Sequence, residues 1–338
     1  MKIEGKMVIL LFVVMILAGM HGYARSQPNG NQEKNDMDKL IRQLADKDAA
    51  MREKAVWALG DTMSTEAAEA LGKSLSDVEW RVRMAAAVGL GKIRDRKAAP
   101  HLLIATGDAE PAVRTAAVHA LGHIKDPETV EPLIKALSDE GLLRASVVWA
   151  LGEFNDVRTV EPLIKTLGDR DPAVRCAVAE ALGKTKDQRG VEPLVNALRD
   201  RKEEVKQCAA LALGKHRDTT AVEPLIRLLA DKSPNVRGMA SIALAKLGDS
   251  KGLAAVRDVR EKEQELNLHR ALDAALGSSD AVQSLIDDLG GPRWQEAEFY
   301  LENMGGLVLP ALKTALAKEG NQQAKELLER IIEKVSQE

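Results

Sequence analysis

Aromatic residues, cysteines and any excess of charge are scarce in this sequence. Only 3% of the 338 residues are aromatic, so the core has to be built from the aliphatic side chains within the 45% hydrophobic content. The 48 basic and 51 acidic residues nearly balance. The chain therefore lacks the basic footprint that is typical of proteins that bind nucleic acids. We expect no nucleic-acid partner.

Long hydrophobic runs are absent too, apart from one run near the N-terminus. Two lysines precede an apolar run of 14 residues, 7–20, and small residues that fit a signal-peptidase site follow it before Arg25. A membrane span needs about 20 residues. We predict a signal peptide at residues 1–24, export to the periplasm or the cell exterior, and no stable membrane span after cleavage. The alternative is an uncleaved signal that anchors the protein to the membrane.

What the chain has instead is a phrase that returns about every 31 residues. The phrase contains Asp, Val-Arg, Ala-Leu-Gly and Val-Glu-Pro-Leu in that order. Its six clear copies end at Gly60, Gly91, Gly122, Gly152, Gly183 and Gly214. A period of this length indicates a solenoid of stacked units, and the helical spacing of the apolar residues predicts two helices in each unit. The fold class is all-α, with about ten helix pairs.

Composition divides the chain into four parts. Residues 1–24 are the predicted signal peptide, and residues 25–36 are polar and rich in turn formers, which predicts a flexible linker. Residues 37–249 hold the regular repeats. Residues 250–338 hold degenerate repeats, which we expect to cap the exposed end of the core.

The stretch from Val113 to Gly122 is a full copy of Val-Arg-x-Ala-Ala-x-x-Ala-Leu-Gly, and it resembles the HEAT-like repeat of the phycobilin-lyase type. The resemblance is strong over residues 37–250 and weak beyond them. It implies a right-handed α-solenoid in which the second helix of each pair lines a concave groove. It does not choose a function, because the family contains chromophore lyases, an iron hydroxylase and plain scaffolds.

Neither enzyme branch of this family fits the chain. The hydroxylase places His-Glu pairs directly after the repeat arginine, and no His-Glu dipeptide occurs in this sequence. The lyases act in the cytoplasm, whereas the N-terminus predicts export. We expect no enzymatic activity and no cofactor.

Two polar ladders run through the repeats. The acidic ladder lies in the turn before each second helix: Asp46, Asp77, Asp108, Asp139, Asp169, Asp200 and Asp231. The basic ladder lies one turn inside that helix: Arg52, Arg83, Arg114, Arg144, Arg175 and Arg237, with Lys206 in the remaining repeat. An anion-binding track is one interpretation. Occurrence in every repeat favours a stacking device, in which each Asp accepts from helix N-terminal amides and pairs with an arginine.

Function in a solenoid is expected where the repeats differ. Positions spaced by four residues form one stripe on each second helix, and the resemblance implies that this stripe faces the groove. Its aromatic and imidazole candidates for partner binding are Trp57, Trp80, His119, His123 and Trp149. Its charged candidates are Glu53, Asp61, Glu153, Lys184, Lys215 and Lys246. Exposed tryptophan is enriched at binding hot spots, and the alternative is that these rings fill gaps between helices.

Two further groups leave alternatives open. His119 and His123 have the spacing of two metal ligands on one helix, but no third ligand is evident, so solvated histidines are expected. Cys176 and Cys208 fall in adjacent repeats, one register step apart. Helix axes lie about 8–10 Å apart, while a disulfide needs Cα atoms about 4.4–6.8 Å apart. We expect two buried thiols, with a bridge as the alternative.

These observations predict an exported, monomeric, non-enzymatic scaffold that binds another protein along the groove. Tryptophans would anchor the partner and the charged residues would orient it. The alternative is a small-molecule or metal-binding protein related to the phycobilin lyases.

Overall fold

The computed structural model describes residues 30–138, 142–262, 272–277, 279–289, 294–317 and 322–336. The predicted signal peptide and Asp139 lie outside the described residues. Every regular element within them is a helix, which confirms the all-α prediction. No helix in this part of the chain is both long and apolar enough to cross a membrane.

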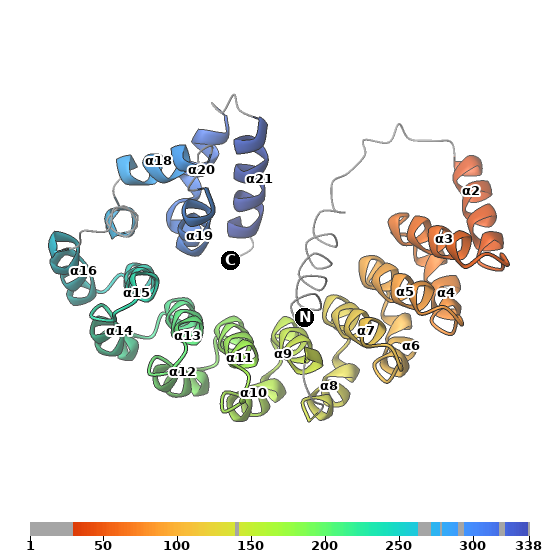
Figure 1. Cartoon of the computed structure of the whole chain (residues 1–338), viewed down its shortest axis with the longest axis horizontal. Coiled ribbons are helices and arrows are strands. Elements are labelled where there is room, and N and C mark those ends of the chain that lie inside the picture. The colour runs from red at the N-terminus through yellow and green to blue at the C-terminus, as the bar shows by residue number, and fades with distance from the viewer. Residues whose placement is uncertain are drawn as a thin grey trace, which may run out of the picture.

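The helices form two layers that bend into an arc (Figure 1). The inner, concave layer is made of α3 (Ala49–Asp61), α5 (Trp80–Ile93), α7 (Pro111–Ile124), α9 (Leu142–Phe154), α11 (Pro172–Thr185), α13 (Glu203–His216) and α15 (Pro234–Leu247). The outer layer is made of α4 (Thr65–Ser74), α6 (Ala99–Ala105), α8 (Val130–Ala136), α10 (Val160–Thr166), α12 (Val191–Ala197) and α14 (Val222–Leu228). The second helix of each pair therefore lines the concave side, as the resemblance implies.

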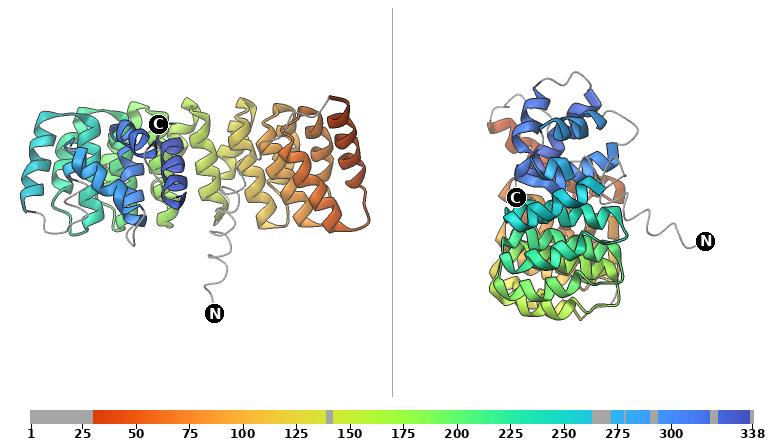
Figure 2. Two further views of the ribbon diagram at one scale, coloured as in Figure 1. Left: turned by 90° about the horizontal axis from the view of Figure 1, so that it is seen from above. Right: turned by 90° about the vertical axis from the view of Figure 1, so that its left-hand side faces the viewer.

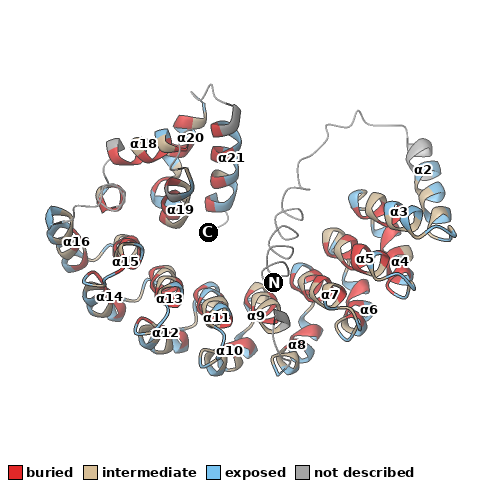
Figure 3. Ribbon diagram, in the orientation of Figure 1, coloured by how far each residue is buried: buried red, intermediate tan, exposed pale blue. Residues whose placement is uncertain are grey.

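The core lies between these two layers and continues from one repeat to the next (Figure 3). The leucine of each Ala-Leu-Gly phrase is fully buried there: Leu59, Leu90, Leu121, Leu151, Leu182 and Leu213. Alanines fill the remaining contacts between inner helices, which explains how a core can form with so few aromatic rings. Each unit buries its apolar face only by stacking on its neighbours.

The glycine of the phrase allows the inner helices to approach closely. A Cβ on Gly91 would lie 2.9 Å from the Cα atom of Ala120 on the next inner helix, closer than real Cβ atoms approach other atoms. This glycine lies inside α5, which runs on to Ile93. Its role is therefore close packing and not the ending of a helix.

Each outer helix from the third repeat onward begins with a turn of 3-10 helix: η1 (Arg96–Ala98), η2 (Pro127–Thr129), η3 (Val157–Thr159), η4 (Gln188–Gly190) and η5 (Thr219–Ala221). An aspartate caps each of these turns. Asp156, for example, accepts a hydrogen bond from the backbone N–H of Arg158 at 2.9 Å. An aspartate at this place after the phrase can cap the turn that follows, because its carboxylate accepts from a free backbone N–H.

The two polar ladders connect adjacent repeats. Arg83 donates from Nε and Nη2 to the two carboxylate oxygens of Asp108, 25 residues later, at 2.7 and 2.8 Å. A third hydrogen bond, 2.8 Å long, runs from Nη1 to the backbone oxygen of Asp77 in its own repeat. Asp108 in turn accepts from the backbone N–H of Glu110 at 2.8 Å.

The same contact repeats along the arc. The other described pairs that join a ladder cation to the aspartate of the next repeat are Arg52–Asp77, Arg144–Asp169, Arg175–Asp200 and Lys206–Asp231. Arg114 and Arg237 donate to the backbone oxygens of Asp108 and Asp231 in their own repeats. The hydrogen bond from Arg83 lowers the pKa of Asp108, and Arg175 has the same effect on Asp200. These positions are therefore occupied by contacts within the stack.

The first helix begins earlier than the sequence predicted. α2 (Gly30–Gln43) includes residues 30–36, which were expected to belong to a flexible linker. No proline follows Pro28 in this stretch, so the helix can extend over these residues by nearly two turns. The repeats themselves keep the predicted register from α3 onward.

The C-terminal repeats curl more tightly than the rest. After α16 (Ser250–Lys262), the described helices are α18 (Ser279–Asp288), α19 (Trp294–Met304), α20 (Leu309–Leu316) and α21 (Gln322–Ser336), with a 3-10 turn η6 (Gly305–Leu307). α19 contacts α15, and Figure 1 shows α19 and α21 inside the arc. The left view in Figure 2 shows the same helices over the C-terminal half of the solenoid.

Ion pairs hold α21 to α19. Arg330 pairs with Glu298 and Lys334 pairs with Glu302, each 32 residues apart. Tyr300 is buried in the core of these degenerate repeats, while Trp294 packs against that core and stays partly exposed. These two aromatic residues therefore contribute to packing at the C-terminal end of the stack.

Candidate functional site

Trp57 lies half-buried on α3, in the concave layer. Its indole N–H donates to Oε1 of Glu53, one turn earlier, at 3.4 Å. The ammonium nitrogen of Lys92 lies 5.7 Å from the indole ring centre and also pairs with Asp61 at 2.7 Å. A cation at this distance from an indole face is attracted to it. The ring is therefore held in one place by charged neighbours on two repeats.

Trp149 lies half-buried on α9 among the predicted histidines. Its ring centre is 4.5 Å from that of His119 and 5.2 Å from that of His123. A Cβ on Gly122 would lie 2.7 Å from Cζ3 of the indole, so the glycine leaves the space that the ring fills. Three rings from two adjacent repeats thus form one cluster on the concave side.

The histidines of this cluster favour the neutral form. Burial, assisted by the nearby His123, lowers the pKa of His119 to about 4. Burial also lowers the pKa of His123, and the positive charge of Arg94 acts in the same direction. Both imidazoles pack on Trp149, and within the described residues neither belongs to a group of three potential metal-ligand atoms. The arrangement therefore gives no support to a histidine metal site.

Two of the acidic candidates, Asp61 and Glu153, form ion pairs with lysines of the neighbouring repeats. Glu153 accepts hydrogen bonds from Lys184, one repeat later, and from Lys125 at 3.0 Å. Burial by itself would raise the pKa of Glu153, but these lysines more than offset it and lower the pKa. Asp61–Lys92 and Glu153–Lys184 both have a separation of 31 residues, which is one repeat. This spacing was the signal in the sequence that could have revealed the pairs.

The remaining candidates lie along the same stripe. Trp80 is the first residue of α5, half-buried, with the guanidinium of Arg81 5.3 Å from its ring centre. Lys215 and Lys246 are half-buried on α13 and α15. The stripe therefore divides into an aromatic part on α3 to α9 and a lysine-rich part on α11 to α15.

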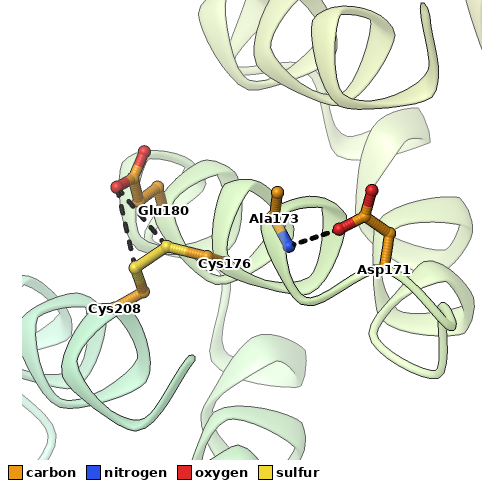
Figure 4. The surroundings of a disulfide bond; sticks show 5 residues. All are labelled: Asp171, Ala173, Cys176, Glu180 and Cys208. Carbon is orange, nitrogen blue, oxygen red and sulfur yellow. Dashed lines mark hydrogen bonds between the residues drawn. A yellow bond between two sulfur atoms is a disulfide. The ribbon is translucent and has the colours of Figure 1, made fainter. Parts of the chain in front are cut away.

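The expectation of free cysteines is wrong. Cys176 on α11 and Cys208 on α13 form a disulfide, with Cα atoms 5.4 Å apart (Figure 4). The general spacing of helix axes failed as a guide here because the phrase glycine brings these two helices unusually close. A Cβ on Gly183 of α11 would lie 2.9 Å from the Cα atom of Ala212 on α13. Because the two helices are so close, the cysteines can bond although they do not occupy equivalent positions in their repeats.

Glu180 lies directly beside the disulfide and was not among the predicted site residues. It follows Cys176 by one helical turn, and Figure 4 shows its carboxylate over the two sulfur atoms. Loss of hydration beside the neighbouring protein atoms raises the pKa of the Glu180 carboxyl. The positive charges of Lys184, Lys215 and Lys334 act in the opposite direction. Lys334 belongs to α21, so the C-terminal helix reaches this part of the concave face.

Comparison with known families identifies the repeat. The model that describes HEAT repeats matches residues 37–108, 100–142, 131–202 and 191–277. This confirms the predicted HEAT-like repeat. No curated protein sequence matches the chain.

Solved structures share the fold at low sequence identity. The E. coli protein YibA is 22% identical, with a TM-score of 0.51, and the match covers 75% of this chain and 99% of YibA. Kap95p, in its complex with RanGDP, is 13% identical with a TM-score of 0.52, over 89% of this chain and 51% of that one. A chain from the complex of CpcE and CpcF of phycocyanin lyase from Nostoc sp. is 23% identical with a TM-score of 0.43, over 75% and 98%. At these identities the likeness concerns the fold alone.

Proposed function

We propose, on the premise that this chain belongs to the family of HEAT repeat proteins, that it is a non-enzymatic scaffold that binds another protein along its concave face. The observation that carries the proposal is the pair of half-buried tryptophans, Trp57 and Trp149, on inner helices of a chain with four tryptophans in all. Each ring is fixed by its neighbours while part of it stays exposed. A rigid aromatic anchor binds at low entropic cost, because its rotamer is already set.

The spacing of these anchors constrains the partner. α3 and α9 are three inner-helix steps apart, and packed helices lie about 8–10 Å from one another, so the anchors are at most about 24–30 Å apart, because the phrase glycines bring the inner helices closer than usual. A partner helix of about 16–20 residues spans that distance at 1.5 Å per residue. An extended segment of about 8–9 residues also spans it. The partner segment is therefore short enough to be a single helix or strand.

The charged residues have a different part in this proposal than in the sequence-based one. Asp61 and Glu153 are already paired with lysines, so they hold adjacent repeats in register and shape the surface. We retain export as part of the proposal. The disulfide supports it, since disulfides persist mainly in oxidising compartments such as the periplasm.

The test is affinity capture from an envelope extract with the full chain and with a variant that carries Trp57→Ala and Trp149→Ala. We expect one protein to be recovered by the parent chain and lost with the double variant. Trp294→Ala, which removes a partly exposed tryptophan on α19, is the matched control and should retain the partner.

Circular dichroism of both variants shows whether the helices remain intact. Equal recovery of the same proteins by the parent and the folded double variant would refute the proposal and assign the two rings to packing alone.

A further inference from the structure

The cluster of Cys176, Cys208 and Glu180 has the composition of a metal site. Oε1 of Glu180 lies 4.0 Å from Sγ of Cys176 and 3.8 Å from Sγ of Cys208. One potential ligand atom from each of the three residues lies within 4.8 Å of the others. In the disulfide, neither sulfur carries a proton that it could donate to the carboxylate. The position of Glu180 over the two sulfurs (Figure 4) is thus better suited to the reduced pair.

We propose that reduction of the disulfide converts this cluster into a Zn²⁺ site. The thiolates of Cys176 and Cys208 and the carboxylate of Glu180 provide three ligands, and water occupies the fourth position. The proposal is independent of partner binding by the aromatic part of the concave face.

The geometry fits a tetrahedral zinc ion with little movement. Zn–S bonds are about 2.3 Å and Zn–O bonds about 2.0–2.2 Å, which places ligand atoms about 3.5–3.8 Å apart around the ion. The two oxygen–sulfur distances are already 3.8 and 4.0 Å. Only the sulfur atoms have to separate, and the 5.4 Å between the two Cα atoms leaves their side chains room to turn.

The donor set selects the class of metal. Two thiolates and one carboxylate suit a borderline-soft divalent ion, whereas Mg²⁺ and Ca²⁺ prefer oxygen ligands only. Glu180 and Cys176 come from one helix, four residues apart, and so share one face of α11. Cys208 is buried and Glu180 is exposed on the concave side, which leaves the ion a path from solvent.

The charges around the cluster also favour this site. Zn²⁺ with two thiolates and a carboxylate has a net charge of −1. The charges of Lys184, Lys215 and Lys334 reach the carboxylate. These positive charges oppose the net negative charge of such a site.

The redox step balances with an external dithiol. A dithiol reductant of the thioredoxin class attacks the disulfide, becomes a disulfide itself, and leaves two thiols on this protein in a two-electron exchange. Zinc binding then displaces one proton from each thiol. Reoxidation by a disulfide donor expels the ion.

The test compares zinc binding by the full chain in its reduced and oxidised forms. The protein is reduced with dithiothreitol, desalted without oxygen, exposed to Zn²⁺ alone, desalted again and analysed for metal by mass spectrometry. We expect one zinc per reduced chain and none per oxidised chain. Glu180→Gln should weaken the binding at least tenfold in a competition titration with a chelator.

Two comparisons keep this result interpretable. Glu204→Gln replaces an exposed glutamate on α13 outside the cluster and should bind zinc as the parent does. The oxidised parent involves no substitution, so this control does not depend on whether a cysteine variant folds. Reduced parent that holds no stoichiometric zinc, or binding that Glu180→Gln leaves unchanged, would overturn the proposal.

Discussion

The two halves of the concave face are built on the same stack but present different chemistry. From α3 to α9 the stripe carries tryptophans and histidines that pack on one another, as around Trp149. From α11 to α15 the stripe carries the disulfide and lysines. Lys334 of α21 is close enough to this part for its charge to act on Glu180. The ladder of polar contacts runs through both halves, with Lys206 in place of one arginine. The difference teaches that the repeat fixes the stack, whereas the variable stripe fixes what each half of the face can do.

Reduction of the disulfide should produce the largest change, and only in the C-terminal half. The cross-link closes a loop of 32 residues, and in the chain-entropy account such a loop contributes about 3–4 kcal/mol to the free energy of unfolding. We expect urea denaturation, followed by circular dichroism in the absence of metal, to show this loss after reduction. Cys176→Ser with Cys208→Ser should unfold at the same urea concentration with and without reductant. An unchanged midpoint in the parent chain after reduction would contradict this expectation.

Removal of a ladder arginine tests what the two halves share. Arg83→Ala leaves Asp108 largely buried without its cation, and Arg175→Ala does the same to Asp200. We expect each variant to lose about 2–3 kcal/mol of unfolding free energy, because the pairs are mostly but not completely buried. Arg96→Ala, at an exposed position, is the control and should change little. A much larger loss of unfolding free energy in one variant than in the other would show that the ladder does not stabilise the two halves equally.

Acidification should affect the aromatic half through His119. Its pKa in the folded chain is about 4, below the usual value of 6.5, so folding favours the neutral imidazole. The stabilisation is complete above pH 6.5 and is lost as the pH falls from 6.5 towards 4. We expect a loss on the order of 1–2 kcal/mol from this residue, after allowance for its partial exposure.

The measurement is thermal unfolding between pH 7 and pH 4, followed by circular dichroism. In His119→Gln the pH dependence should become shallower. His123 beside it and His216 on α13 also have pKa values lowered by burial, so these two residues supply a residual dependence. If the stability of the parent and of His119→Gln depended equally on pH, the pH dependence could not be attributed to His119.

The smallest effect is expected from the exposed pair of Asp61 and Lys92. The side chain of Asp61 is 65% exposed, so its ion pair contributes less than about 1 kcal/mol. Asp61→Asn should leave the melting temperature nearly unchanged. It should alter Trp57 fluorescence, since Lys92 then loses one of the contacts that hold it over the indole. A change in stability without a change in fluorescence would show that Lys92 does not position the ring.

Much of this architecture could be predicted from the sequence because it depends on local pattern. The repeated leucines such as Leu121, the helical spacing and the capping aspartates act within one unit or between identical neighbours. Their physical consequences are therefore the same in every copy. The ladder pairs were open to prediction for the same reason, although the sequence did not decide between the aspartate of the same repeat and that of the next.

The candidate site was less predictable because it depends on how far each helix approaches the next. The spacing of the residues predicted that Trp57, Trp149 and the two histidines lie on one stripe. It did not predict which charged residues would form ion pairs. Lys125, which pairs with Glu153, does not follow the four-residue spacing of the stripe and lies at the left-handed residue that ends α7. The same left-handed position recurs at Arg94, Lys186 and Arg217, so the repeat fixes where this residue lies but not which partner its side chain finds.

The sequence alone therefore determined the all-α class, the repeat length, the register and the buried leucines, because periodic burial has one solution when every unit is alike. The tertiary structure decided the disulfide, the position of Glu180 above it and the approach of α21 to the concave face. These features depend on the exact separation of stacked helices and on the curvature that accumulates along them. Both quantities are set by the packing of small residues such as Gly183 against their neighbours, which the one-dimensional pattern does not record.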